Sequence, residues 1–301
     1  MGYVILSRCG SSDIFYYKIM KYGTGALESP YDLRQYHYEP LDGAGFDWEN
    51  GYDVEAKLDI KLVTKDQNGS SSCGGQAWAY YGEVLETVAT GTYEPRSARW
   101  IYSHTRSPDG AGSRGRDNAS FVIKNGWVSE TLVPSYDKGR APKEPFFATK
   151  PEVTQEIKEE KEVNRSQSYL SVKPNIEIVA QAIRDNYGCV LVVNGENNGT
   201  WRTTYPKPPK VKEWGHFVYA GKVKSVKGRR FIGVKNSWGN IGEDGWQWIG
   251  EDYFDSGHVR EGWTHQWDYE PAKVKVLLKQ TVNLYTQLLN ILKSMYEKTV
   301  A

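Results

Sequence analysis

One stretch, residues 65–81, constrains the chain more than any other: a polar loop rich in Ser and Gly runs directly into a helical pattern. Apolar residues then recur at spacings of three and four, at Ala77, Tyr80, Tyr81, Val84, Leu85 and Val88. This spacing predicts an amphipathic helix, with Ser71 or Ser72 as its N-cap and Gly91 as its end. Cys73 therefore lies at a helix N-terminus, where unpaired backbone N–H groups and the helix dipole stabilise a thiolate. The alternative is a small buried cysteine at a loop–helix junction.

A second stretch, far downstream, supplies the residue types that a cysteine nucleophile needs. His216 lies in a strand-like apolar run at 214–221, and Asn236 ends another at 231–236. A thiol needs a base to take its proton, and the base needs a partner that orients it. His216 and Asn236 are the residue types that fill these two roles, each on a strand-like run that ends near the other.

With these residues in view, the sequence resembles the papain-like cysteine peptidases. The resemblance is carried by Gln67, six residues before Cys73, and by Ser72 directly before it. Lys-Asn-Ser-Trp-Gly at 235–239 and a Gly-Glu-x-Gly-aromatic run at 242–246 add to it, in the family's order Gln, Cys, His, Asn. The absence of the family's disulfide cysteines makes the chain look more like bacterial or phage members than secreted eukaryotic ones.

The resemblance implies an α+β fold of two lobes, one helical and one built on an antiparallel sheet. It covers residues 46–270, which we expect to form the peptidase domain. Residues 1–45 precede it as an N-terminal arm, far shorter than the family's usual inhibitory prosegment, and we expect a structural arm rather than a latency peptide. Residues 137–170 crowd Lys, Glu and Pro, which indicates an exposed connection between the lobes.

The resemblance also implies a mechanism and a site. His216 would draw the proton from Cys73, Asn236 would fix the imidazole, and Trp238 would shield that contact from water. The Gln67 side chain and the Cys73 backbone N–H would hold the oxyanion. We expect hydrolysis of peptide or protein substrates, as an endopeptidase, without a metal or other cofactor.

The substrate-binding positions are expected on both sides of the thiol. A glycine-rich strip in this place pairs its backbone with an extended substrate in papain-like enzymes, and Gly112 and Gly115 suit that role because glycine allows close approach. An ordinary loop is the alternative. Val193 and Phe217 are the candidates for the side-chain subsite, and Trp238 is placed beside them at the substrate site.

One departure from the family's pattern keeps other readings open. Gly74 stands where the family commonly has Trp after the cysteine; aligning on Trp78 instead would put Ala77 at the nucleophile's place and make the protein inactive. We prefer Cys73, because only that register keeps Gln67 six residues upstream. A non-catalytic binding or assembly module therefore remains an alternative, as does a ligase that uses the same acyl-enzyme.

Composition and charge narrow the function classes. Lysine plus arginine, 38, nearly balance aspartate plus glutamate, 37, so nothing favours nucleic acid as a partner. The five histidines include no His-Glu-x-x-His motif, and the three cysteines, Cys9, Cys73 and Cys189, form no Cys-x-x-Cys pair and no disulfide framework. Without a signal peptide or a run of membrane-spanning length, we expect a cytoplasmic protein.

The last segment, residues 271–301, differs in kind from the rest. Its apolar residues come in adjacent pairs, such as Leu277/Leu278 and Leu288/Leu289, which form two neighbouring seams on one long helix. Such a wide face favours self-association or docking on a partner over packing on its own domain, with binding to a membrane surface third.

Overall fold

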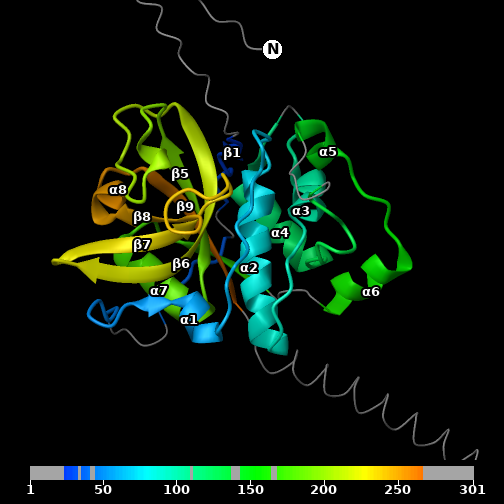
Figure 1. The fold of residues 1–301 in the computed structure, drawn as a ribbon, viewed down its shortest axis with the longest axis horizontal. Coiled ribbons are helices and arrows are strands. Elements are labelled where there is room, and N and C mark those ends of the chain that lie inside the picture. The colour runs from blue at the N-terminus through cyan, green and yellow to red at the C-terminus, as the bar shows by residue number, and fades with distance from the viewer. Residues whose placement is uncertain are drawn as a thin grey trace, which may run out of the picture.

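The computed structural model describes residues 24–32, 35–40, 45–108, 111–136, 143–163 and 168–266. Within these residues, helices gather on one side of the molecule and an antiparallel sheet on the other (Figure 1). The predicted α+β fold of two lobes is therefore confirmed. The predicted C-terminal helix at 271–301 and the first part of the arm lie outside the described residues.

The helical lobe is built around one long, almost wholly buried helix. Its helices are α2 (Cys73–Thr90), α3 (Ala98–Thr105), α4 (Gly115–Asn125), α5 (Glu144–Ala148) and α6 (Gln155–Val163). α2 ends where the sequence predicts: Gly91 adopts φ 73°, and its N–H donates to Thr87 O at 2.8 Å. Because α2 is apolar on most of its surface, it packs against helices on one side and the sheet on the other.

The second lobe contains a seven-stranded sheet in the order β4-β9-β5-β6-β7-β8, with β2 added beside β6. The strands are β2 (Tyr52–Asp53), β4 (Ser168–Val172), β5 (Cys189–Gly195), β6 (Trp214–Val226), β7 (Arg229–Lys235), β8 (Trp246–Gly250) and β9 (Val259–Gln266). Short or amphipathic helices complete the lobe: α1 (Val54–Leu58), α7 (Ile176–Asn186), α8 (Glu251–Asp255) and the 3₁₀ turn η1 (Thr200–Arg202). The β6–β7 hairpin turns at Lys227 and Gly228, both with positive φ, as a tight hairpin turn requires.

β6 joins the two hydrophobic cores. Phe217 and Tyr219 belong to the core shared with α2, whereas Val218 and Ala220 belong to the core beneath α7. Successive residues of a strand point to opposite faces, so a continuous apolar run is what a strand buried on both sides needs. His216 begins this run and is thereby held at the junction of the lobes.

The segment between the lobes is mostly exposed in its described part, with a few residues anchored in the helical lobe. Its described part, 143–163, contains α5 and α6, and Phe147 is buried in the core of the helical lobe. Glu160 on α6 pairs with the buried Arg96 at 2.5 Å. Most of the charged residues in this part are exposed, as the composition predicts, whereas Glu160 finds its partner inside the helical lobe.

No helix in the described ranges combines the length and the apolar character needed to cross a membrane.

Candidate active site

Cys73 is the first residue of α2, at the N-terminus that the sequence predicts, while Ala77 lies one turn inside the helix. The thiol is fully buried, and nearby backbone N–H groups, those of Phe217, Gly25, Gly74 and Cys73 itself, act to lower its pKa. These donors favour a thiolate, but burial outweighs them and raises the pKa of Cys73 to about 11. The expected stabilisation of a thiolate at a helix N-terminus is therefore overridden by burial in this conformation.

The loop before Cys73 is held by its own side chains. Ser72 makes no capping bond to the helix backbone; its hydroxyl lies 2.8 Å from Ser70 Oγ and accepts from Gln76 Nε2 at 3.3 Å. Gln67 Nε2 donates to Ser70 O at 2.6 Å, and Ser70 Oγ donates back to Gln67 O at 2.6 Å. These reciprocal bonds fix the glutamine amide and the start of α2 as one unit.

Gln67 is also tied to the segment that carries Asn236. Its backbone N–H donates to Ser237 O at 2.9 Å, and Ser237 Oγ donates to Gln67 Oε1 at 2.7 Å. Ser237 N in turn donates to Asn236 Oδ1 at 2.7 Å. The structure therefore brings the predicted oxyanion residue and the predicted orienting residue into one hydrogen-bond network.

His216 and Asn236 meet as the sequence predicts. His216 Nε2 lies 2.9 Å from Asn236 Oδ1, and both side chains are fully buried. His216 Nδ1 has no hydrogen-bond partner among the described residues. Phe217, the next residue of β6, is one of those whose backbone N–H acts to lower the pKa of Cys73, so the imidazole and the thiol lie on adjoining segments.

An aromatic enclosure surrounds the imidazole. The Trp238 ring lies 4.4 Å from the His216 ring between centroids, and the rings of Trp201 and Trp214 each lie 6.3 Å away, nearly perpendicular to it. Burial lowers the pKa of His216 to about 4, although the hydrogen bond to Asn236 opposes that shift. The predicted shielding role of Trp238 agrees with this packing.

One residue of this network has no counterpart in the sequence prediction. Gln247 is fully buried on β8, and its Oε1 accepts from Asn236 Nδ2 at 2.6 Å. It directly follows the glycine–aromatic pair Gly245-Trp246, but its side chain could have been placed at Asn236 only by knowing that β8 pairs with β7.

The N-terminal arm crosses directly over this site. β1 (Ala26–Leu27) pairs in parallel with β3 (Ser113–Arg114), and Ser113 N donates to Gly25 O at 2.9 Å. Gly25 fits so closely that a Cβ on it would lie 2.2 Å from Ser71 O. The arm thus occupies the strip beside Gly112, where the sequence predicts that a substrate backbone pairs.

A clasp between the lobes holds the arm beyond this point. Ser29 donates to Glu261 from its backbone N–H at 2.9 Å and from its hydroxyl at 2.7 Å, and it accepts from Arg116 N at 3.2 Å. Arg116 also pairs with Asp32 on the arm at 3.1 Å. Neither Ser29 nor Glu261 stood out in the sequence, because their positions are set by contacts across more than 200 residues of chain.

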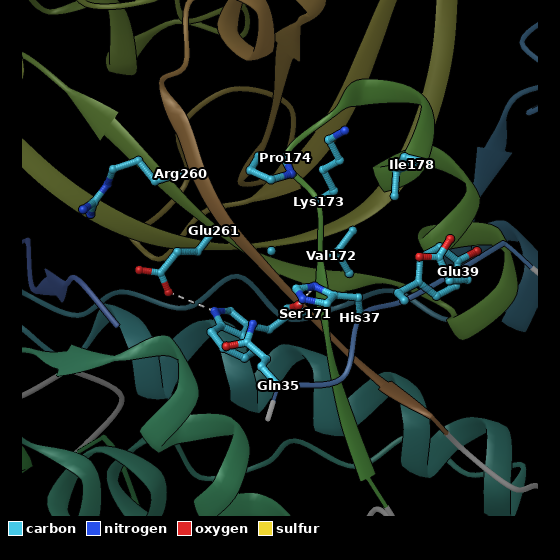
Figure 2. A pocket seen from close by; sticks show the side chains of 13 residues that line it. Gln35, His37, Glu39, Ser171, Val172, Lys173, Pro174, Ile178, Arg260 and Glu261 are labelled. Atoms are coloured by element: carbon cyan, nitrogen blue, oxygen red, sulfur yellow. Dashed lines mark hydrogen bonds between the residues drawn. The ribbon is translucent and has the colours of Figure 1, made fainter. Parts of the chain in front are cut away.

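Farther along, the arm runs beside β4 and β9. Tyr38 N donates to Ser171 O at 2.8 Å, and Ser171 N donates to Tyr36 O at 2.9 Å. Figure 2 shows the arm residues Gln35, His37 and Glu39 facing β4 and β9 across a pocket of about 380 Å³, with the Glu261 carboxylate on its wall. This stretch anchors the arm to the β lobe by strand-like pairing.

The other predicted substrate positions lie at different depths. Gly112, with φ 101°, packs against Gly25, and Gly115 opens α4 against the Trp263 indole. Val193 and Phe217 are fully buried, Val193 in the core of the β lobe and Phe217 in the core shared with α2. Their contact with a substrate side chain stays a prediction.

Among the described residues, no group of three or more His, Cys, Asp or Glu side chains is placed to hold a metal ion.

Comparison with known proteins gives a consistent result at the level of the fold. No protein-family model matches the sequence, and no curated protein matches it. Among solved structures, xylellain, a cysteine protease from Xylella fastidiosa, is similar with a TM-score of 0.68 and 21% identity over 88% of this chain and 99% of that one. The proform of the ragweed cysteine protease Amb a 11 gives 0.60 and 18%, over 76% and 67% of the two chains. Procathepsin L 3 of Tenebrio molitor gives 0.59 and 16%, over 81% and 76%.

The two lobes, the cysteine at the start of the central helix and the likeness to these structures lead to one conclusion: the chain has the fold of the papain-like cysteine peptidases.

Proposed function

We propose that the protein is a cysteine peptidase that hydrolyses peptide bonds with Cys73 as nucleophile, His216 as base and Asn236 as the orienting residue. One observation carries the proposal: His216 Nε2 lies 2.9 Å from Asn236 Oδ1, whereas Nδ1 has no hydrogen-bond partner among the described residues and can face a thiol. In catalysis by an activated thiol, a base takes the proton of the nucleophile and a third group holds the base in the right orientation.

The proposed reaction follows from these groups. His216 Nδ1 takes the proton of the Cys73 thiol, and the thiolate adds to the peptide carbonyl. The Gln67 amide and the Cys73 backbone N–H stabilise the oxyanion. His216 then gives the proton to the departing amine, and the acyl group stays on Cys73 as a thioester. Water, deprotonated by His216, hydrolyses the thioester and restores the thiol.

The described conformation is a closed one. The arm buries the thiol, and burial favours the uncharged forms of both groups: the pKa of Cys73 is raised to about 11 and that of His216 is lowered to about 4. A thiolate–imidazolium pair therefore requires the arm to move. We propose that the arm is a latency segment, in place of the purely structural role expected from its short length; the similar structures include proforms.

The departure at Gly74 has a packing explanation, which weakens the argument for an inactive module. A Cβ on Gly74 would lie 2.4 Å from Ser113 Oγ and 2.5 Å from Asn118 Nδ2, so these side chains fill the space that a larger residue would need. The substitution of Gly for Trp therefore reflects repacking of the helical lobe beside the thiol. It removes no group from the proposed reaction.

Peptide hydrolysis and thiol labelling together test the proposal. Full-length protein carrying Gly25→Ala, in which the added methyl group displaces the arm, should cleave internal bonds of an unstructured protein substrate, and an epoxide reagent should modify its Cys73 and stop cleavage. His216→Ala should abolish cleavage while the protein stays folded. Adding an amine acceptor separates a hydrolase from a ligase, because a ligase would yield the new amide as the main product. Cleavage that persists in His216→Ala would contradict the assignment of the base.

A further inference from the structure

Gln247 carries a constraint on the catalytic histidine that the triad alone does not supply. Its Nε2 donates to Trp201 O in the η1 turn at 3.0 Å and to Thr203 O, directly after the turn, at 2.7 Å. A backbone carbonyl can only accept a hydrogen bond, so the amide nitrogen of Gln247 must face the turn. Its Oε1 must then face Asn236, and this oxygen can only accept.

The orientation of Gln247 fixes that of Asn236, and Asn236 in turn fixes the tautomer of His216. Because Gln247 presents an acceptor, Asn236 must turn its Nδ2 toward it and its Oδ1 toward His216. Ser237 N, which can only donate, also contacts Asn236 Oδ1 at 2.7 Å and supports the same orientation. With an acceptor fixed at 2.9 Å, neutral His216 must carry its proton on Nε2.

We infer that Gln247 is a positioning residue that locks the Asn236 amide, and through it the His216 tautomer whose Nδ1 lone pair can take the thiol proton. The inference rests on the proposed function in that His216 acts as the base. Gln247 touches no reacting atom; it acts through Asn236. Full burial of Gln247, Asn236 and His216 keeps water from substituting for a lost partner.

The most direct test reads the tautomer and needs no turnover. The sample is full-length Cys73→Ala with ¹⁵N-histidine, so that no thiol shares the proton, at about pH 8, where a histidine with a lowered pKa is neutral. NMR should show the His216 proton on Nε2, the signal being assigned by its loss in a variant that also carries His216→Ala. A proton on Nδ1 overturns the inference.

Two substitutions in the Cys73→Ala chain show whether Gln247 orients Asn236 or only fills space in the core. Gln247→Glu keeps an oxygen acceptor facing Asn236, so His216 should retain its Nε2 proton. Gln247→Leu removes the acceptor, so the two tautomers should become mixed. If Gln247→Leu leaves the tautomer unchanged, the inference is wrong. If Gln247→Leu does not fold, Gln247→Glu still tests the inference. A change of the His216 tautomer in Gln247→Glu would contradict it, because that variant keeps the oxygen that accepts from Asn236.

Kinetics provide the second readout in the chain that keeps Cys73. Gln247→Leu should lower kcat about tenfold with little change in KM, because it misplaces the base without touching a substrate contact. Gln181→Leu is the matched control: a buried glutamine on α7, a helix that carries none of the triad residues. Equal losses in both variants would assign the effect to general destabilisation and overturn the inference. The NMR measurement does not depend on activity. A wrong tautomer would therefore overturn this inference alone, whereas absence of cleavage would count against the proposed peptidase function.

Discussion

Gly25→Ala tests whether the arm controls access to the thiol. The added Cβ would lie 2.2 Å from Ser71 O and 2.8 Å from Ser71 Cβ, both well inside contact distance, and Ser71 sits on the rigid loop that precedes Cys73. The arm must therefore shift away from its path. Forcing an extra methyl group into a packed site costs about 1–3 kcal/mol, which corresponds to an increase of about 5- to 150-fold in the population with the arm displaced.

The assay is the rate at which iodoacetamide modifies Cys73, followed by peptide mapping so that the other cysteines are read separately. When opening and closing are fast, this rate follows the population of the open state. Gly25→Ala should raise it by the factor above and leave the labelling of the buried Cys189 unchanged.

Gly45→Ala is the matched control, because it adds the same methyl group to the same arm where the nearest atom is 3.5 Å away, an ordinary contact. Its labelling rate should equal that of the wild type. The reasoning is refuted if Gly25→Ala labels no faster than Gly45→Ala, or if wild-type Cys73 already reacts as fast as a free thiol.

Three further predictions concern the clasp, the triad and the response to acid. Ser29→Ala removes the hydroxyl bond to Glu261 and should raise the labelling rate of Cys73 about tenfold, whereas Ser256→Ala, an exposed helix-end serine, should not. Asn236→Ala should lower kcat while mostly sparing KM, since it removes the orienting acceptor; a rise in KM alone would argue against that role. His265 is buried, neither of its ring nitrogens has a hydrogen-bond partner among the described residues, and burial lowers its pKa to about 3. Between these pH values the imidazole of His265 is protonated in the unfolded chain but not in the folded one, so the free energy of unfolding should fall as the pH drops from about 6.5 toward 3. Denaturant titrations of His265→Phe should show a shallower fall.

The sequence was most informative where chemistry and local pattern coincide. Cys73 at the start of a periodic helix and Asn236 at the end of an apolar run could be placed because capping and periodicity are local properties. Their meeting with His216 followed from the family resemblance, since the segments are distant in the chain.

What the sequence could not reveal depends on contacts made across the fold. Glu261 and Ser29 meet only because the arm runs between the lobes, and Gln247 reaches Asn236 only because β8 lies beside β7. The pKa of Cys73 shows the same limit: the helix N-terminus predicts a lowered value, while burial of the thiol in the folded chain reverses the sign. The wide apolar helix predicted at 271–301 lies outside the described residues, and its role in self-association stays a prediction.

The central claim is that Cys73 forms the acyl-enzyme. The most direct measurement is mass spectrometry of the Gly25→Ala protein quenched in acid during turnover of a slow ester or peptide substrate, beside the same protein carrying Cys73→Ala. The account predicts one acyl adduct on the tryptic peptide that contains Cys73, none on Cys189, and neither adduct nor product release in the Cys73→Ala protein. Product release at the same rate in the Cys73→Ala protein, or an adduct on another residue, would contradict it.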